Sequence, residues 1–161
     1  MNGIVGAFRA IFLNHQSTGE VVAQQAAALA EAKSKCTVLV IDDDAGVLDV
    51  MRPLLKEDGY TVLTAQSGAK GLDLLRYAQK DVRVVILDYN MPRLTGSDTL
   101  NYVRKLAPHT KVIALSGVQA ELLPEEYRDS VDRLMHKPFR GGELVRAIND
   151  LAGIELPKVA A

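Results

Sequence analysis

Three runs of four apolar residues recur along the chain, and each is followed directly by an acidic or hydroxyl-bearing residue. The runs are Val38–Ile41, Val84–Leu87 and Val112–Leu115. A continuous apolar run of this length is typical of a strand buried on both faces, as in parallel sheets covered by helices. Because sites in open α/β sheets form along the carboxyl edge of the strands, the pattern predicts a polar site there.

The residues that follow these runs share one chemical theme. Asp42 and Asp43 follow the first run, Asp88 follows the second and Ser116 follows the third, while Lys137 follows a shorter apolar stretch. Packing alone does not explain three acids, a hydroxyl and an ammonium group at one edge of a sheet. The sequence therefore predicts an acidic pocket.

Helical patterns alternate with the strands from Thr37 onward. A further strand is expected at Tyr60–Ala65, after the turn signal Asp58-Gly59. Apolar residues at helical spacing predict the intervening helices, for example Val47, Leu48, Met51, Leu54 and Leu55 in the first of them. The segment 119–130 forms a weaker pattern, interrupted by Pro124. Five strand–helix units predict an α/β fold with a five-stranded, doubly wound parallel sheet.

Four stretches carry a family resemblance: VLVIDDDAGVLDVMRPLL, VVILDYNMPRLTG, VIALSG and MHKPF. Together they resemble the CheY-like receiver domain of two-component response regulators. The shared pattern is an acidic pair, an aspartate before a Met-Pro-x-x-x-Gly turn, a Ser or Thr, and a Lys-Pro. The resemblance covers about residues 36–153 and implies the flavodoxin-like strand order 2-1-3-4-5.

The resemblance also implies a metal-dependent reaction. Asp43, Asp88 and the backbone carbonyl of Asn90 are expected to bind Mg²⁺ directly, with Asp42 acting through a metal-bound water. Asp88 is expected to take a phosphoryl group from a histidine kinase or phosphotransfer protein and to pass the signal to a downstream protein target. The chain is thus expected to be a signalling phosphoacceptor rather than an enzyme, with only intrinsic self-phosphorylation and autodephosphorylation.

The remaining residues of the implied site handle the phosphoryl oxygens. Lys137 is expected to neutralise them, and the Ser116 hydroxyl and the Gly117 amide to hydrogen-bond them. Pro138 is expected to be cis, as in the family. Leu134 stands where the family usually has an aromatic residue that swings inward on activation. The conformational shift is therefore expected in the loop after Ser116 and in the segment 119–130.

The flanking segments and the composition bound the partners. Residues 1–35 are expected to form a helical extension, with a second helix running from the capping-box sequence Ser17–Glu20 through Lys33, packed on its own domain or on a second copy in a homodimer. The tail, residues 154–161, is too short for an output domain, so a stand-alone receiver is expected. A net charge of −1 predicts no nucleic-acid partner, and the absence of an 18-residue apolar run predicts no membrane span. The single cysteine, Cys36, fits a cytoplasmic protein.

Two alternatives remain open on sequence grounds. Asp42-Asp43-Asp44 also fits the opening motif of haloacid-dehalogenase-like phosphatases, with Asp42 as nucleophile and Asp44 as general acid. That interpretation leaves the motif around Asp88 unexplained, and Asp44 equally fits a helix N-cap. The second alternative is a degenerate receiver that acts only as an interaction domain, against which the complete set of pocket residues argues.

Overall fold

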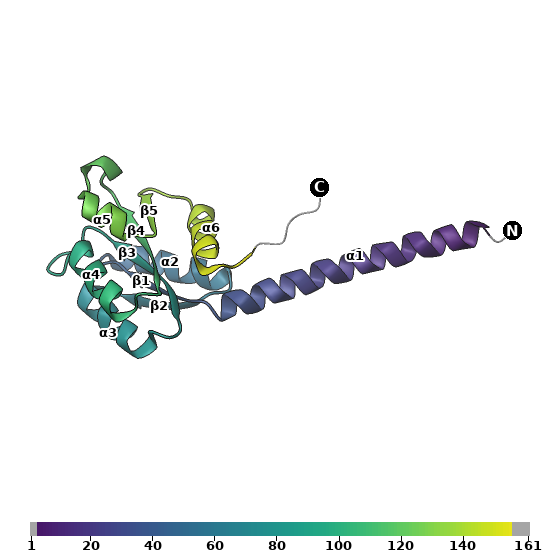
Figure 1. The fold of residues 1–161 in the computed structure, drawn as a ribbon, viewed down its shortest axis with the longest axis horizontal. Helices are drawn as coiled ribbons and strands as arrows, with labels where there is room; N and C mark the ends of the chain where they lie inside the picture. The colour runs from purple at the N-terminus through teal and green to yellow at the C-terminus, as the bar shows by residue number, and fades with distance from the viewer. Residues whose placement is uncertain (1–2, 156–161) are drawn as a thin grey trace.

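The apolar runs form the centre of a five-stranded, all-parallel sheet in a computed structural model that describes residues 3–155 and, within them, the side chains of residues 19–155. The strands lie in the order β2-β1-β3-β4-β5 (Figure 1). They are β1 (Thr37–Ile41), β2 (Thr61–Ala65), β3 (Val82–Asp88), β4 (Lys111–Ser116) and β5 (Arg133–His136). The predicted fold class and strand order are therefore confirmed.

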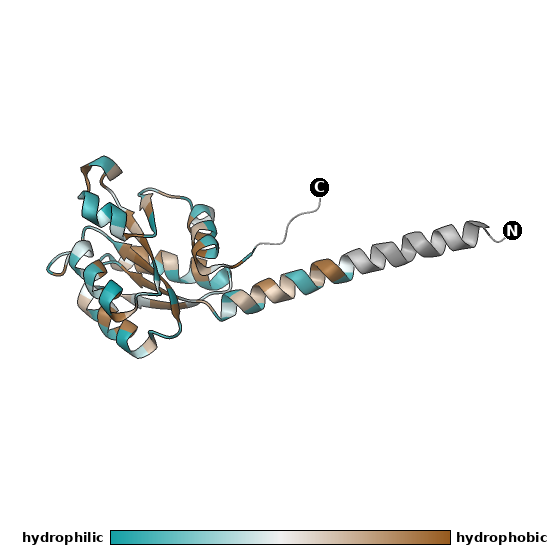
Figure 2. Ribbon diagram, viewed as in Figure 1, coloured by the Kyte–Doolittle hydropathy of each residue, from teal (hydrophilic) through white to brown (hydrophobic). Residues whose placement is uncertain are grey.

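Helices cover both faces of the sheet, which explains why the central strands are apolar throughout rather than alternating. The helices after β1 are α2 (Ala45–Glu57), α3 (Gly68–Ala78), α4 (Gly96–Leu106), the short 3₁₀ turn η1 (Ala120–Leu122), α5 (Glu125–Ser130) and α6 (Gly141–Ala152). As the sequence pattern predicted, Pro124 separates η1 from α5. In Figure 2 the apolar strands lie in the interior, between helices whose outer surfaces are largely polar.

Successive strand residues enter two separate cores. Leu39 and Ile41 belong to one core, with Leu72 and Leu75 of α3, Leu100 and Val103 of α4 and Tyr127 of α5. Val38 and Val40 belong to the other, with Leu48, Met51 and Leu55 of α2 and Leu144 and Ile148 of α6. Because both faces are packed in this way, the strand ends, and the polar residues that follow them, are held in fixed register.

The N-terminal extension is one continuous helix, α1 (Gly3–Ser34), so the expected break at Ser17–Glu20 is wrong. The alanine-rich sequence that follows has high helix propensity and contains no residue that breaks a helix. Residues 1–2 and 156–161 of the predicted extension and tail lie outside the description. Within residues 3–155, no helix is both long and apolar enough to cross a membrane.

Helix α1 extends away from the sheet and contacts it through its last turn (Figure 1). The buried Lys33 ammonium lies 2.5 Å from Asp58 and over the ring of Tyr60. Most side chains from Gly19 to Ala32 are exposed, including Val21 and Val22. The sequence did not reveal this attachment, because a lysine at the end of a helix is more often solvated.

A charged network forms beside β5, the edge strand farthest from β2. The Asp132 carboxylate accepts hydrogen bonds from Arg104, Lys111 and the Val112 amide, at 2.7, 3.0 and 2.8 Å. Arg104 also donates to the carbonyls of Ser130 and Thr110. These bonds join α4, β4 and the end of α5. Burial acts to raise the pKa of Asp132, but the hydrogen bonds outweigh it and leave that pKa below its usual range.

The Asp132 network predicts acid-sensitive stability. A carboxyl whose pKa is lowered in the folded state stabilises the fold above its unfolded pKa of about 3.9, and this is lost as the pH falls through the folded pKa. We expect Asp132→Asn to lower the free energy of unfolding by about 1.5–3 kcal/mol at pH 7, and the difference from wild type to shrink at low pH. Urea denaturation across pH measures this. Asp81→Asn, at an exposed position, is the control, and a pH-independent difference for Asp132→Asn would contradict the prediction.

A close backbone approach fixes the turn after β3. A Cβ atom at Gly96 would lie 2.7 Å from the Asp88 carbonyl oxygen and 2.7 Å from the Tyr89 Cα, so only glycine fits without a shift. The Gly96 amide also donates to the Tyr89 carbonyl. The glycine of the Met-Pro-x-x-x-Gly turn therefore allows α4 to begin directly against the end of β3.

We expect Gly96→Ala to destabilise the protein by about 1–3 kcal/mol, because the added methyl group meets backbone atoms that have no alternative position. Gly117→Ala is the matched control, since a Cβ at Gly117 meets nothing within 4 Å. Urea denaturation of the two variants provides the comparison. Equal stability of Gly96→Ala and Gly117→Ala would show that this approach does not constrain the turn.

Candidate acidic phosphoacceptor site

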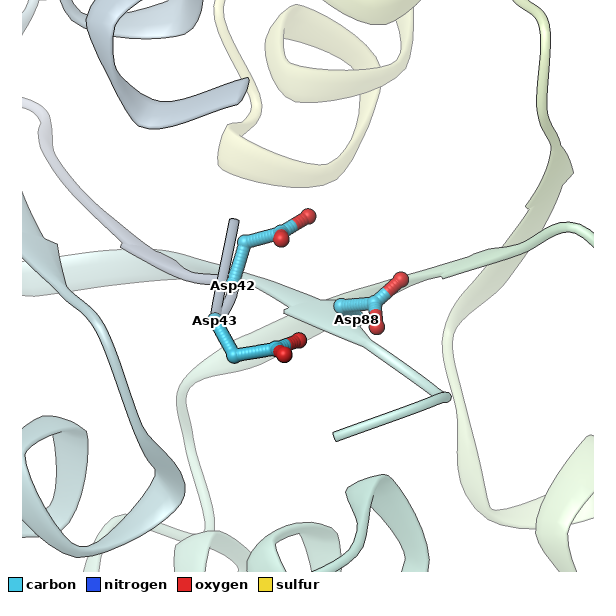
Figure 3. A group of neighbouring side chains, drawn as sticks. All are labelled: Asp42, Asp43 and Asp88. Carbon is cyan, nitrogen blue, oxygen red and sulfur yellow. The ribbon is translucent and has the colours of Figure 1, made fainter. Parts of the chain in front are cut away.

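The ends of β1 and β3 bring three carboxylates together. Asp42 and Asp43 follow β1, and Asp88 is the last residue of its neighbour β3, so all three side chains lie at one edge of the sheet (Figure 3). One carboxylate oxygen of each lies within 4.8 Å of the others. Asp42 and Asp88 are 2% and 5% exposed, whereas Asp43 is exposed. Two buried acids and a third, exposed one therefore form a cluster of negative charge.

Lys137 lies between the two buried carboxylates. Its ammonium group is 2.9 Å from Asp42 and 2.8 Å from Asp88. The other oxygen of Asp42 accepts the Asp44 amide at 2.9 Å, so both oxygens of Asp42 are already engaged. Asp43 and the second oxygen of Asp88 are therefore better placed than Asp42 to bind a further cation.

Burial and the neighbouring charges shift the pKa values of Asp88 and Lys137. Burial raises the pKa of the Asp88 carboxyl above its usual range; the Lys137 ammonium opposes the rise and the Asp42 charge adds to it. For Lys137 itself, burial acts to lower the pKa, but the hydrogen bonds to Asp88 and Asp42 outweigh it and raise the pKa. The lysine thus stays charged and supports the ionised form of the carboxylate that it contacts.

Ser116 ends β4 and is fully buried, but its hydroxyl is engaged with its own loop. The Ser116 Oγ accepts the Val118 amide and donates to the Val118 carbonyl, both at 2.9 Å. Gly117 is exposed, with open space beside its Cα. Ser116 directly follows Leu115, which pairs with Asp88, but its hydroxyl bonds within its own loop rather than to the acidic cluster.

Lys137 lies directly after β5, and Asn90 lies in the turn after β3. The Lys137 amide donates to the Ser116 carbonyl at 2.7 Å, which continues the pairing of β4 with β5 beyond its last residue pair. The Lys137–Pro138 peptide bond is cis, as the resemblance implied. Asn90 lies exposed in the turn after β3, two residues beyond Asp88.

Asp44 lies outside the acidic cluster. It is the N-cap of α2, and its side chain accepts the Gly46 amide at 2.8 Å. The phosphatase alternative requires Asp44 as a free general acid, so this hydrogen bond argues against that alternative.

Sequence reasoning did not single out two aromatic residues beside the site. Tyr89 directly follows Asp88, and its ring lies 4.8 Å from the ring of Tyr127 on α5, centroid to centroid. Tyr127 is 4% exposed, and its hydroxyl has no hydrogen-bond partner in the described residues. One signal was available, because Tyr127 is the only aromatic residue between Gln119 and Ser130.

A curated relative is similar to this chain in sequence. The chain is 30% identical over 113 residues to the cell cycle transcriptional regulator CtrA of Caulobacter vibrioides, which covers 70% of this chain and 48% of CtrA. The chain therefore spans about half the length of the curated relatives that it matches.

Two solved structures extend the comparison. A response regulator receiver domain protein from Clostridium thermocellum is 33% identical with a TM-score of 0.69, covering 73% of this chain and 94% of that one. The response regulator protein TrrA of Thermotoga maritima, solved in complex with Mg²⁺–BeF, is 26% identical with a TM-score of 0.62, covering 71% and 97%. The family model for the response regulator receiver domain matches residues 38–149. The chain therefore belongs to the response regulator receiver family.

Proposed function

We propose that this receiver accepts a phosphoryl group on Asp88 from a histidine kinase or phosphotransfer protein, in a Mg²⁺-dependent reaction, and signals through the conformational change that follows. The observation that carries the proposal is the position of Asp88. It is buried at the end of a central strand, 2.8 Å from Lys137 and beside two further carboxylates. A structural aspartate needs no such surroundings.

The residues present fit a magnesium ion. Three carboxylates offer hard oxygen ligands, and their mutual repulsion is relieved by a divalent cation. Asp43 and Asp88 would hold the ion directly, together with the Asn90 carbonyl. Asp42 would act through a water, because Lys137 and the Asp44 amide already occupy its oxygens. When bound, the ion supplies positive charge next to the phosphoryl oxygens.

The chain's own groups perform the transfer. An Asp88 carboxylate oxygen forms the new bond to phosphorus, while the bond from phosphorus to the donor's imidazole nitrogen breaks and its electron pair stays on that nitrogen. Lys137 neutralises a phosphoryl oxygen, and the Ser116 hydroxyl and Gly117 amide donate to the others. Such transfer depends mainly on positioning and charge neutralisation, which these groups provide.

The proposed product changes the local balance of hydrogen bonds. A phosphoryl group brings roughly −1.5 to −2 charge at neutral pH. Ser116 has one hydroxyl proton, which it donates to the Val118 carbonyl in this structure. To serve a phosphoryl oxygen, that proton must leave Val118. Modification of Asp88 therefore favours a different conformation of the 116–118 loop, which a downstream protein target can recognise.

We further propose that α1 brings a second copy of the chain into contact. Lys33 attaches the helix to the domain, while Val21 and Val22 remain about half exposed. Over 32 residues the helix is about 48 Å long, and an isolated helix gains most of its stability by packing an apolar face against a partner.

Phosphorylation should require Asp88 specifically. We expect incubation with Mg²⁺ and a small-molecule phosphodonor to add one phosphoryl mass to the wild type and none to Asp88→Asn. Asp49→Asn, an exposed position on α2, is the control that keeps the modification. Intact-mass spectrometry provides the measurement, and a phosphorylated Asp88→Asn would contradict the assignment.

Metal binding should depend on Asp43, because this site has few protein ligands. We expect Asp43→Ala to abolish Mg²⁺ binding in the millimolar range, and Asp44→Asn to leave it unchanged because asparagine also caps helices. Calorimetric titration of both variants compares them. Unchanged Mg²⁺ affinity in Asp43→Ala would contradict the proposed ligand set.

Removal of residues 1–32, which retains Lys33, should leave phosphorylation of Asp88 intact and change the oligomeric state from dimer to monomer. Light scattering coupled to size-exclusion chromatography measures the mass in solution. A 161-residue chain that is monomeric at the same concentration would rule out the proposed role of α1 in self-association.

A further inference from the structure

Tyr127 is a buried aromatic residue of α5 that contacts the turn after Asp88. Its ring contacts that of Tyr89, the residue after Asp88, with centroids 4.8 Å apart and planes inclined by 57°. It also belongs to the core against which Val118 and Leu134 pack. Tyr127 therefore contacts the turn that carries the acceptor and shares a core with the loop after Ser116.

The Tyr127 hydroxyl is buried without a hydrogen-bond partner among the described residues. A buried polar group without a hydrogen-bond partner destabilises the fold, and in native proteins nearly all buried polar groups have one. Burial raises the pKa of Tyr127, and the charges of Asp88 and Tyr89 raise it further. The Tyr127 hydroxyl can therefore form a hydrogen bond in a second conformation that brings an acceptor to it.

The loop after Ser116, which packs against the same core, contains a complementary group. The Val118 carbonyl accepts the single proton of the Ser116 hydroxyl at 2.9 Å. If that proton turns toward an anionic group on Asp88, the Val118 carbonyl loses its donor. The same step would thus leave the Val118 carbonyl without a donor, while the Tyr127 hydroxyl in the same core has no acceptor among the described residues.

The residue at the usual aromatic position, Leu134, cannot form the hydrogen bond that a tyrosine can form. Leu134 in β5 is half-buried in the same core and carries no polar group. It can fill space but cannot form a hydrogen bond to the loop. The aromatic ring and the hydroxyl near the site are supplied by α5 instead.

We propose that Tyr127 is a positioning residue that links Asp88 to the η1–α5 segment, residues 119–130. When an anionic group on Asp88 draws the Ser116 hydroxyl away from Val118, the Tyr127 hydroxyl donates to the vacated Val118 carbonyl and holds α5 against the rearranged loop. This inference rests on the proposed function, because it requires an anionic group at Asp88.

Tyr127→Phe tests the link, since it removes the hydroxyl and keeps the ring. Hydrogen exchange is followed with and without Mg²⁺ and beryllofluoride, a phosphoryl mimic, in two segments: residues 84–96, which report occupancy of the site, and residues 119–130. Tyr102→Phe on α4, a half-exposed tyrosine, is the matched control. We expect all three proteins to respond in 84–96. In residues 119–130 the change in hydrogen exchange caused by beryllofluoride should be at least roughly fivefold smaller in Tyr127→Phe than in wild type. This factor corresponds to the free energy of one ordinary hydrogen bond.

The outcomes separate this inference from the proposed function. An equal response of Tyr127→Phe and wild type in both segments would overturn the link alone. No response of the wild type in residues 84–96 would overturn the proposed function, and the link with it. Stability without ligand provides an independent readout, because a hydroxyl without a partner contributes no hydrogen bond. Tyr127→Phe should therefore be no less stable than wild type in urea, and a clear loss would show that the hydroxyl is already bonded.

Discussion

The contact of one ammonium group with two buried carboxylates is the interaction on which the site depends. Asp42 and Asp88 follow neighbouring strands and are almost fully buried, an arrangement that their mutual repulsion and desolvation oppose. Lys137, held beyond the end of β5, lies within 2.9 Å of both. Removing Lys137 from this cluster would leave two buried carboxylates without compensation, which is strongly destabilising. The parallel sheet makes the arrangement tolerable, because packing on both faces fixes the strand ends that carry these residues.

The same arrangement makes the hydrogen bonds of the site sensitive to a change of charge at Asp88. In this structure Lys137 compensates the acids, and the Ser116 hydroxyl is satisfied within its own loop. Under the proposed function, a phosphoryl group on Asp88 competes for both. It offers Lys137 stronger acceptors and offers Ser116 an alternative to Val118, so a local change of charge is converted into movement of a loop. The Tyr127 hydroxyl, which has no partner among the residues that the structure describes, gives that movement a path to α5. The usual aromatic position, occupied here by Leu134, does not provide such a path.

Much of the fold was predictable from the sequence because its signals are local. Apolar runs mark buried strands, and the pairing of parallel strands places Asp42, Asp88 and Ser116 at one edge once the strand order is known. Long-range side-chain contacts were not predictable. Lys33 on Asp58 and Arg104 on Asp132 join residues that are distant in the sequence, and no periodicity encodes them. The continuous helix α1 was missed because a capping-box sequence was given more weight than the high helix propensity of the alanine-rich stretch after it.

The most direct test of the account is to locate the phosphoryl group. Borohydride reduces an acyl phosphate on aspartate to homoserine, so tandem mass spectrometry of the phosphorylated and reduced protein identifies the modified residue. We predict homoserine at position 88 and at no other aspartate. Homoserine at position 42 would contradict it and favour the phosphatase alternative, and its absence from a protein that has gained the phosphoryl mass would show that the acceptor is not a carboxylate.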